Sequence, residues 1–525
     1  MIITVITIIT FLLLLGSYGP LVWQFLNPPE GKVFLGSFGF PPDFFGNLIS
    51  FEQGRLGHWL HYPKLTSTIS APPTFARFQY NLLGQLSRLL PFEGVISFHF
   101  FRFLFSLAFM FLTAFLIWKI FSHWFGRITA FTLAFFASSF FSLKLINFWS
   151  PLGVFQRAAY YPHYLWSFVF LLLAFWWLYR ALEEKKVSLL LLASFFGFLT
   201  AFHPPVIVSF YLTFPFYLLI FLFRQKPNFK NFLKEAGFLA IFVAISSPPL
   251  FYLWQIGKIH PLDLLTRFDL EYNLIKFITL KDFFLGIGLV ALFSFAGGFL
   301  AIKKSSRLFW LLAPWSVVYI LGFFVVWEIA NSNSARFLQT PFFVFLGILT
   351  TLALEEIYRR KKIFLAWGLF LITIFSGFPA WFLSLKANIE NFTSAHFSYP
   401  YIFSSPSKVE ALRWLGKNSQ EKDVVLSGET NGMLIAAFTG NYPYLTVYAP
   451  QDGEYDKIWE NSRLFFQKKW PEKKASEFVK KEKIKFVWIE NEENIIAGGK
   501  FEPYLFLEKV FENQEVIIYK VKQVP

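Results

Sequence analysis

Long apolar runs recur along most of the chain, and they restrict its fold more than any other feature of the sequence. A helix needs about 20 mostly apolar residues to cross the hydrocarbon core of a membrane. About eleven runs of this kind occur before residue 386. They cover residues 2–26, 97–121, 128–146, 164–182, 188–202, 206–223, 236–256, 284–302, 308–327, 340–358 and 363–385. We therefore predict a mainly α protein, a polytopic bundle of transmembrane helices.

The composition supports a membrane protein. Hydrophobic residues make up 55% of the chain and charged residues only 15%, whereas soluble domains carry about 25% charged residues. The first run has neither a basic segment before it nor a cleavage site of small residues, so we interpret it as a retained span. The chain has no Cys, which excludes disulfides and cysteine-ligated metals.

The positive charge of the chain predicts its orientation. The net charge is +15, and the excess lies before residue 386, mainly in alternate short loops. Basic residues gather in the loops at 119–127, 180–186, 224–234, 303–307 and 359–362. Short loops rich in Lys and Arg stay in the cytoplasm, so we predict a cytoplasmic N-terminus and an extracytoplasmic C-terminal region. This distribution indicates topology and contact with membrane lipids, and it argues against a nucleic acid partner.

The apolar runs divide the chain into a transmembrane domain, a linker and a C-terminal domain. Residues 1–385 form the transmembrane domain, with a long first outer loop at 27–96 in which residues 79–90 predict a short interfacial helix. Residues 386–407 form a linker rich in Tyr, Pro and Ser. Residues 408–525 predict a small extracytoplasmic α/β domain. Its helices are expected at 408–417, 431–438 and 473–483, and its strands at 424–426, 486–489 and 516–521.

Acidic residues of the first outer loop are candidates for catalysis. Asp43 lies in the apolar stretch FPPDFFG at 40–46. An apolar environment raises the pKa of a carboxyl group, and a general base that deprotonates a hydroxyl needs this kind of setting. The alternative is a structural role in a helix N-terminus or a turn. Glu52 is a second candidate, for substrate contact, with a solvated helix position as its alternative.

Four basic side chains near the outer ends of the spans are candidates for substrate binding: Arg102, Arg157, His203 and Arg336. A charged group at this depth is costly and commonly lies on a substrate path. The planar guanidinium of Arg suits a phosphate because it donates two parallel hydrogen bonds. The alternative for each Arg is snorkelling of its charge to the lipid headgroups.

Several short motifs resemble the GT-C superfamily of membrane glycosyltransferases, in particular the bacterial protein-mannosyltransferase and aminoarabinose-transferase type. Besides the order of spans, long first loop and extracytoplasmic tail, the resemblance is carried by local stretches. These are PDFF at 42–45, QGR at 53–55, GHWL at 57–60, FHP at 202–204, ARF at 335–337, DVVL at 423–426 and TGN at 439–441.

This resemblance implies transfer of a sugar from a polyprenyl-phosphate donor to an envelope glycan, lipid or protein at the outer face of the cytoplasmic membrane. By its match to the first-loop acid, Asp43 would be the general base or would help to hold a divalent cation. Arg336 and Arg157 would face the lipid phosphate. Many members of the superfamily carry a second acidic residue in the first or second outer loop, and residues 147–162 of this chain contain none.

Two other functions remain open from the sequence. The first is a transporter or flippase for lipid-linked glycans, and the second is a non-catalytic membrane protein of the envelope. The two halves of the transmembrane region show no internal repeat, and the long loops lie on one side only. The candidate charges lie near the outer ends of the spans and not at the bilayer midplane, where transport sites usually lie. These observations favour the glycosyltransferase.

Overall fold

The computed structural model describes residues 2–64, 66–67, 71–139, 153–260, 262–263, 277–329, 333–390, 399–447 and 453–522. It divides into two compact units. The first unit consists of residues 1–19, 100–255 and 266–387, and the second of residues 20–99, 256–265 and 388–525. We predicted the loop at 27–96 as part of the transmembrane domain, whereas in the structure this loop belongs to the same unit as the C-terminal residues.

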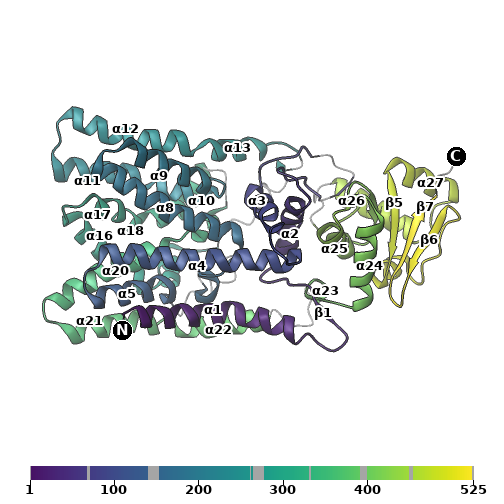
Figure 1. The fold of residues 1–525 in the computed structure, drawn as a ribbon, viewed down its shortest axis with the longest axis horizontal. Coiled ribbons are helices and arrows are strands. Elements are labelled where there is room, and N and C mark those ends of the chain that lie inside the picture. The colour runs from purple at the N-terminus through teal and green to yellow at the C-terminus, as the bar shows by residue number, and fades with distance from the viewer. Residues whose placement is uncertain are drawn as a thin grey trace. The chain divides into compact units, whose positions relative to one another are not determined.

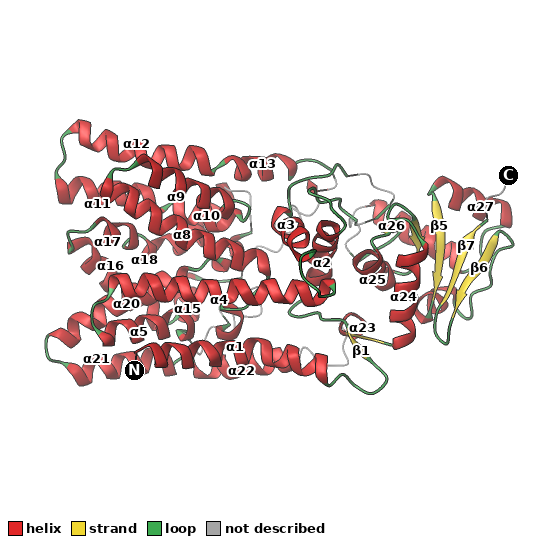
Figure 2. Cartoon of the chain, viewed as in Figure 1, coloured by secondary structure: helices red, strands yellow, loops and turns green. Residues whose placement is uncertain are grey.

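The described part of the first unit is built from helices (Figure 2). The helices α1 (Ile2–Leu26) and α4 (Gly94–Ile120) contribute most of their length to it. The other helices, in chain order, are α5 (Trp124–Phe136), α7 (Val154–Arg157), α8 (Pro162–Glu184), α9 (Val187–Thr200), α10 (Pro204–Tyr211), α11 (Thr213–Gln225), α12 (Phe229–Ser246), α13 (Pro248–Ile256), α15 (Leu280–Ile287), α16 (Leu289–Lys303), α17 (Arg307–Leu312), α18 (Trp315–Leu321), η3 (Gly322–Val326), α19 (Trp327–Ile329), η4 (Ser334–Gln339), α20 (Phe342–Arg359), α21 (Ile363–Phe375) and α22 (Phe378–Glu390).

Within the described ranges, 6 helical stretches are long and apolar enough to cross a membrane, or up to 8 if two bent pairs each count as one span. The six are Ile2–Leu26, Gly94–Ile120, Pro162–Glu184, Pro204–Gln225, Arg307–Ile329 and Ile363–Lys386. The helices α5 and α9 are apolar but have only 13 and 14 residues. The chain is therefore a multi-pass membrane protein, and the number of about eleven spans stays a prediction.

Two predicted spans are bent in the structure. The span expected at 236–256 is divided between α12 and α13, which are bent by 44° at their junction. We expected a continuous helix at 284–302, but α15 and α16 meet at an angle of 87°. Gly288 joins them with φ at +84°, and a Cβ at this position would press on Ser139. Residues other than glycine rarely adopt this backbone conformation. Hydropathy alone contains no sign of this turn, because the apolar run predicted as a span continues through Gly288 without a break.

The second unit contains a five-stranded mixed sheet in the order β4-β3-β5-β7-β6. Its strands β5, β7 and β6 are labelled in Figure 1. Strand β3 runs parallel to β4 and β5, whereas β7 runs antiparallel to β5 and β6. Buried Leu426, Phe465, Val487 and Tyr504 belong to the apolar core on this sheet. The C-terminal elements are α23 (Tyr399–Ile402), β2 (Phe403–Ser404), α24 (Pro406–Asn418), β3 (Val424–Leu426), α25 (Glu429–Thr439), β4 (Tyr442–Pro443), α26 (Gly453–Phe466), α27 (Glu472–Lys481), β5 (Ile484–Ile489), α28 (Asn491–Ala497), β6 (Leu507–Glu512) and β7 (Ile517–Val521).

The first outer loop forms β1 (Val33–Phe34), α2 (Pro41–Arg55) and α3 (Phe78–Ser87). Strand β1 pairs antiparallel with β2, so the loop and the C-terminal residues share a small sheet. Helices α2 and α3 approach each other closely, since a Cβ on Gly54 or Gly84 would collide with backbone atoms of the other helix. We predicted an interfacial helix at 79–90. The structure has the helix α3 there, and six of its 10 residues are buried.

A buried lysine links the first loop to the C-terminal residues of the same unit. The Lys64 side chain is 1% exposed, and its Nζ lies 3.2 Å from Glu421 Oε1. The same ammonium donates to the backbone carbonyl of Gly440. The other carboxylate oxygen of Glu421 lies 2.8 Å from His58 Nε2. Glu421 thus connects to two residues of the loop that follows α2.

Replacing Lys64 by Met is expected to destabilise this unit, because the Gly440 carbonyl loses a buried donor and Glu421 loses its counter-charge. We expect a loss of about 2 kcal/mol, which lowers the melting temperature of the purified full-length protein by about 4–8 °C. The matched control is Lys509→Met, because Lys509 forms an exposed pair with Glu512 and exposed pairs contribute little. Equal melting temperatures for the two variants would contradict the role of Lys64.

Candidate active site

Asp43 lies in the first turn of α2. Pro41 and Pro42 occupy the first two positions of the helix, where their missing N–H groups cost nothing and their fixed φ suits the helix. A carboxylate in the first turn is favoured by the positive end of the helix dipole. The Asp43 side chain is exposed, although we expected an apolar environment around it. The apolar residues next to it are instead turned into the core beneath the helix.

The start of α2 is fixed by two phenylalanines that follow Asp43. Phe44 and Phe45 are both 0% exposed. Phe44 stacks on the His99 ring with centroids 5.7 Å apart and an interplanar angle of 8°. His99 Nε2 in turn lies 2.7 Å from the Gly36 carbonyl oxygen. The position of the Asp43 backbone is therefore set by a packed aromatic core, which is what a positioned carboxylate requires.

Glu52, the second acidic candidate, lies near the other end of α2. Both of its carboxylate oxygens accept from Arg55 Nη1 at 3.1 Å. A Cβ on Gly94, the first residue of α4, would overlap the Glu52 carboxylate. Burial raises the pKa of this carboxyl group, against the lowering effect of the Arg55 charge. The Glu52 carboxylate is thus bonded within α2 and packs against the first residue of α4.

A second group of polar residues lies in the first unit around Arg336, in the short helix η4. Arg336 Nη1 donates to the Tyr164 hydroxyl at 3.2 Å and lies 3.4 Å from Gln339 Oε1. The Tyr164 hydroxyl itself donates to Gln339 Oε1 at 2.7 Å. Tyr164 is 3% exposed and Gln339 is 0% exposed. Two buried side chains thus hold the guanidinium in one orientation, and we call these residues together with His203 the arginine cluster.

His203 joins this cluster from the turn before α10. Its ring lies edge-on to Tyr164, with centroids 4.6 Å apart, and 5.6 Å from the His163 ring. His203 is 6% exposed, and its Nε2 finds no hydrogen-bond partner among the residues that the structure describes. A buried polar atom of this kind usually has a partner. The geometry therefore allows His203 Nε2 to bind a ligand atom in the cluster.

Two of the predicted residues thus come together. Tyr164 and Gln339 complete the arginine cluster, and the His163 ring lies beside His203. The sequence did not select His163, Tyr164 or Gln339. In a chain with 21 Tyr and 75 Phe, a Tyr or His next to an apolar run looks like a core residue. Gln339 carries no charge, so the rule that selected the basic candidates passes over it. One hint was available. Tyr164 follows Pro162 at the start of an apolar run, which places it at the outer end of a span on the predicted topology.

Arg157 has a different environment from the one we expected. Its Nη1 donates to the carbonyls of Ala134 and Phe135 at 3.2 and 2.9 Å, and its Nη2 to that of Ala137 at 2.9 Å. The guanidinium also lies 3.6 Å from the centre of the Phe343 ring. The last carbonyls of a helix lack partners within the helix, so Arg157 caps the C-terminal end of α5.

Arg102 is also bonded to backbone carbonyls. Its Nε donates to Ala159 O at 2.8 Å and Tyr160 O at 3.1 Å, and its guanidinium lies 4.6 Å from the centre of the Tyr18 ring. Arg102 is 4% exposed. It therefore fixes the segment just before α8, the helix that carries Tyr164. We infer that Arg102 supports the arginine cluster through the backbone.

We next looked for side chains that could hold a metal ion. In the described ranges, no group of three or more His, Asp or Glu side chains is arranged to hold a metal ion. A divalent cation at Asp43 therefore stays an implication of the sequence resemblance, and we derive no step from it.

No protein-family model and no curated protein sequence matches the chain. Solved structures do match its fold. The apo oligosaccharyltransferase of Archaeoglobus fulgidus has a TM-score of 0.52 at 14% identity, over 93% of this chain and 69% of that one. The archaeal oligosaccharyltransferase AglB from the same organism, in complex with an inhibitory peptide and a dolichol-phosphate, has a TM-score of 0.50 at 14% identity over the same 93% and 69%.

A third structure is the arabinofuranosyltransferase AftD from Mycobacteria, with a TM-score of 0.52 at 14% identity. The match covers 98% of this chain and 40% of AftD. At such low identity the similarity concerns the fold and not individual residues. All of these proteins are membrane glycosyltransferases of the GT-C superfamily, and this chain has the GT-C fold.

Proposed function

We propose that this protein transfers a sugar from a polyprenyl-phosphate donor to an envelope acceptor at the outer face of the cytoplasmic membrane. The single observation that supports this most is the arginine cluster, in which two buried residues orient a guanidinium beside the buried His203. One structure with the same fold holds a dolichol-phosphate, which is a lipid carrier of the polyprenyl-phosphate type. The distribution of basic loops supports an extracytoplasmic position for the C-terminal residues.

In this proposal the donor phosphate binds at the arginine cluster. The Arg336 guanidinium stabilises the negative charge of the phosphate as it leaves the sugar. His203 Nε2 forms a further hydrogen bond to the donor. Tyr164 and Gln339 keep the guanidinium in place, and Arg102 and Arg157 hold the surrounding backbone.

Asp43 acts on the acceptor. Its carboxylate removes the proton from an acceptor hydroxyl, and the hydroxyl oxygen attacks the anomeric carbon of the sugar. The bond between this carbon and the phosphate oxygen breaks, and the polyprenyl phosphate leaves with the electron pair. The acceptor oxygen and the anomeric carbon are then joined by a new glycosidic bond.

The test is transfer of label from a panel of radiolabelled polyprenyl-phosphate sugars in membranes that contain the protein. We expect at least one donor to give labelled glycan, lipid or protein with the wild-type chain and at least about 100-fold less label with Asp43→Asn. Movement of the labelled glycolipid across vesicles without any new glycosidic bond would contradict the proposal and would indicate a transporter.

Tyr164→Phe is expected to raise the KM for the donor about 3- to 10-fold, because Arg336 and Gln339 each lose one hydrogen-bond partner of about 1 kcal/mol. The value of kcat should change less, since Gln339 still contacts the guanidinium. Tyr179→Phe serves as the control, because it lies on the same helix about 22 Å further along the axis. An unchanged donor KM in Tyr164→Phe would show that the hydroxyl does not position Arg336.

A further inference from the structure

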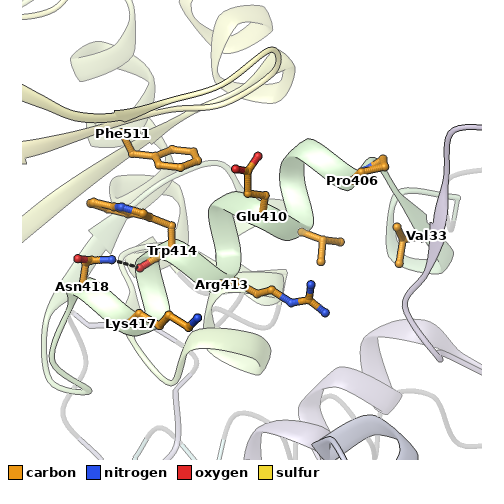
Figure 3. Close-up of a pocket in the computed structure, with 9 residues that line it drawn as sticks. Val33, Pro406, Glu410, Arg413, Trp414, Lys417, Asn418 and Phe511 are labelled. Atoms are coloured by element: carbon orange, nitrogen blue, oxygen red, sulfur yellow. Dashed lines mark hydrogen bonds between the residues drawn. The ribbon is translucent and has the colours of Figure 1, made fainter.

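A groove with an apolar wall lies in the second unit between α24, the sheet and β1. Its volume is about 450 Å³, within the range of about 300–1,000 Å³ that is typical of small-molecule sites. The wall consists of Trp414 from α24 and Phe511 from β6, whose ring centroids lie 5.2 Å apart with 34° between the planes. Both side chains are half-buried, so part of each ring remains accessible in the groove (Figure 3).

Polar and charged groups surround these two rings. Glu410, Arg413, Lys417 and Asn418 line the groove from α24. Figure 3 shows the Glu410 carboxylate beside Phe511, and the Asn418 amide bonded to the Trp414 backbone. Glu410 also accepts a hydrogen bond of 3.0 Å from Asn513. Hydrogen-bond donors and acceptors are therefore both present around the rings.

Three charged side chains line the groove, and a fourth, outside the lining, pairs with one of them. Arg413 and Lys417 are positive, and Glu410 is negative. The fourth charge is Glu93, whose Oε1 lies 3.7 Å from Arg413 Nη2. Both members of this pair are well exposed, at 67% and 79%, so the pair is weak and can rearrange. With Glu93 counted these four side chains carry no net charge, so they do not select an anion such as a free phosphate or an acidic lipid headgroup over a neutral ligand.

A neutral sugar fits this chemistry. One face of a hexopyranose ring consists of C–H groups, which pack on aromatic rings as other apolar surface does. Its hydroxyls donate and accept hydrogen bonds, so they match a rim that holds both a carboxylate and cationic donors. A fully apolar ligand would leave the charged rim without partners.

We propose that the groove between Trp414 and Phe511 binds a neutral hexose unit of a glycan. This inference rests on the proposed function for its biological use, since it gives the second unit a site that holds the glycan part of a substrate. The groove lies outside the arginine cluster and contains neither Asp43 nor Glu52, so binding at the groove and transfer are separable.

The test is binding of neutral oligosaccharides that contain glucose, galactose, mannose or N-acetylglucosamine to the purified full-length protein, followed by saturation-transfer NMR. We expect binding by the wild-type chain and a loss of at least about 10-fold in affinity for Trp414→Ala. Trp459→Ala is the matched control, because Trp459 is a 38% exposed tryptophan of the same unit outside the groove. Asn418→Ala, at an exposed helix end, should weaken binding with at most a small fall in the melting temperature, because the hydrogen bond it loses to the Trp414 carbonyl is exposed.

Failure of this proposal and failure of the proposed function give different results. Wild-type protein that binds only acidic saccharides or only peptides would overturn the hexose site, and so would equal binding by Trp414→Ala and Trp459→Ala. Asp43→Asn should retain full saccharide binding while it loses transfer. Retained transfer in Asp43→Asn together with saccharide binding that depends on Trp414 would overturn the proposed function and leave the groove intact.

Discussion

Asp43→Asn is expected to lower transfer of sugar by at least about 100-fold, because the amide cannot accept the proton of the acceptor hydroxyl. The effect should appear in kcat, with little change in the KM for the donor. Asn occupies the same space and remains compatible with the first turn of a helix. The loss of the favourable helix-dipole contact should lower the free energy of unfolding by about 0.3–1 kcal/mol.

Glu30→Gln is the matched control for this variant. Glu30 is another exposed acid of the same loop, and it lies in the turn after Pro28 and Pro29. If Asp43 is the base, only Asp43→Asn should lose transfer. If transfer depends only on the negative charge of the loop, both variants should lose it. Transfer at the wild-type rate by Asp43→Asn would rule out Asp43 as the base.

Arg336→Ala should have the second large effect. It removes the charged donor that faces the phosphate in our proposal, and hydrogen bonds to charged groups contribute about 1.5–3 kcal/mol. We expect an increase of about 10- to 150-fold in the donor KM, together with a lower kcat because the phosphate leaves with its charge less stabilised. Donor titration of the initial transfer rate in membranes measures both constants.

Arg336→Lys adds a sharper comparison. A lysine keeps the charge but has no planar fork for two parallel hydrogen bonds, and it does not match the Tyr164 and Gln339 partners. It should recover only part of the donor affinity. Arg360→Ala is the control for loss of a positive charge, since Arg360 forms an exposed i,i+4 pair with Glu356. Should Arg336→Ala keep the wild-type donor KM, the phosphate would have to bind elsewhere.

The sequence predicted individual elements well where one local pattern decides the structure. The strand at 424–426 was predicted at the observed bounds. The helix predicted at 408–417 is α24, which begins two residues earlier and ends one residue later. The predicted strand at 516–521 corresponds to β7. Strand β6 and helix α26 were missed, because their charged and aromatic residues follow neither a clear alternation nor a clear apolar face.

For the candidate site residues, the sequence could not distinguish a basic residue that binds a ligand from one that bonds to the backbone. The sequence selected Arg336 and His203 because a charge near the outer end of a span is costly, and the structure brings both to Tyr164. The same rule selected Arg157, which the structure bonds to three backbone carbonyls of the segment 134–137. A buried Arg has the same signal in the sequence whether its partner is a ligand or the end of a helix.

The sequence by itself determined that the chain crosses the membrane several times, since hydropathy depends on composition within a window and on nothing distant. The tertiary structure decided which residues share a site and which elements share a unit. Tyr164 and Gln339 lie 175 residues apart in the chain yet form one hydrogen bond. Lys64 contacts Glu421, from which it is separated by 357 residues. Contacts of this kind arise from packing between distant segments, and no local pattern of residues encodes them.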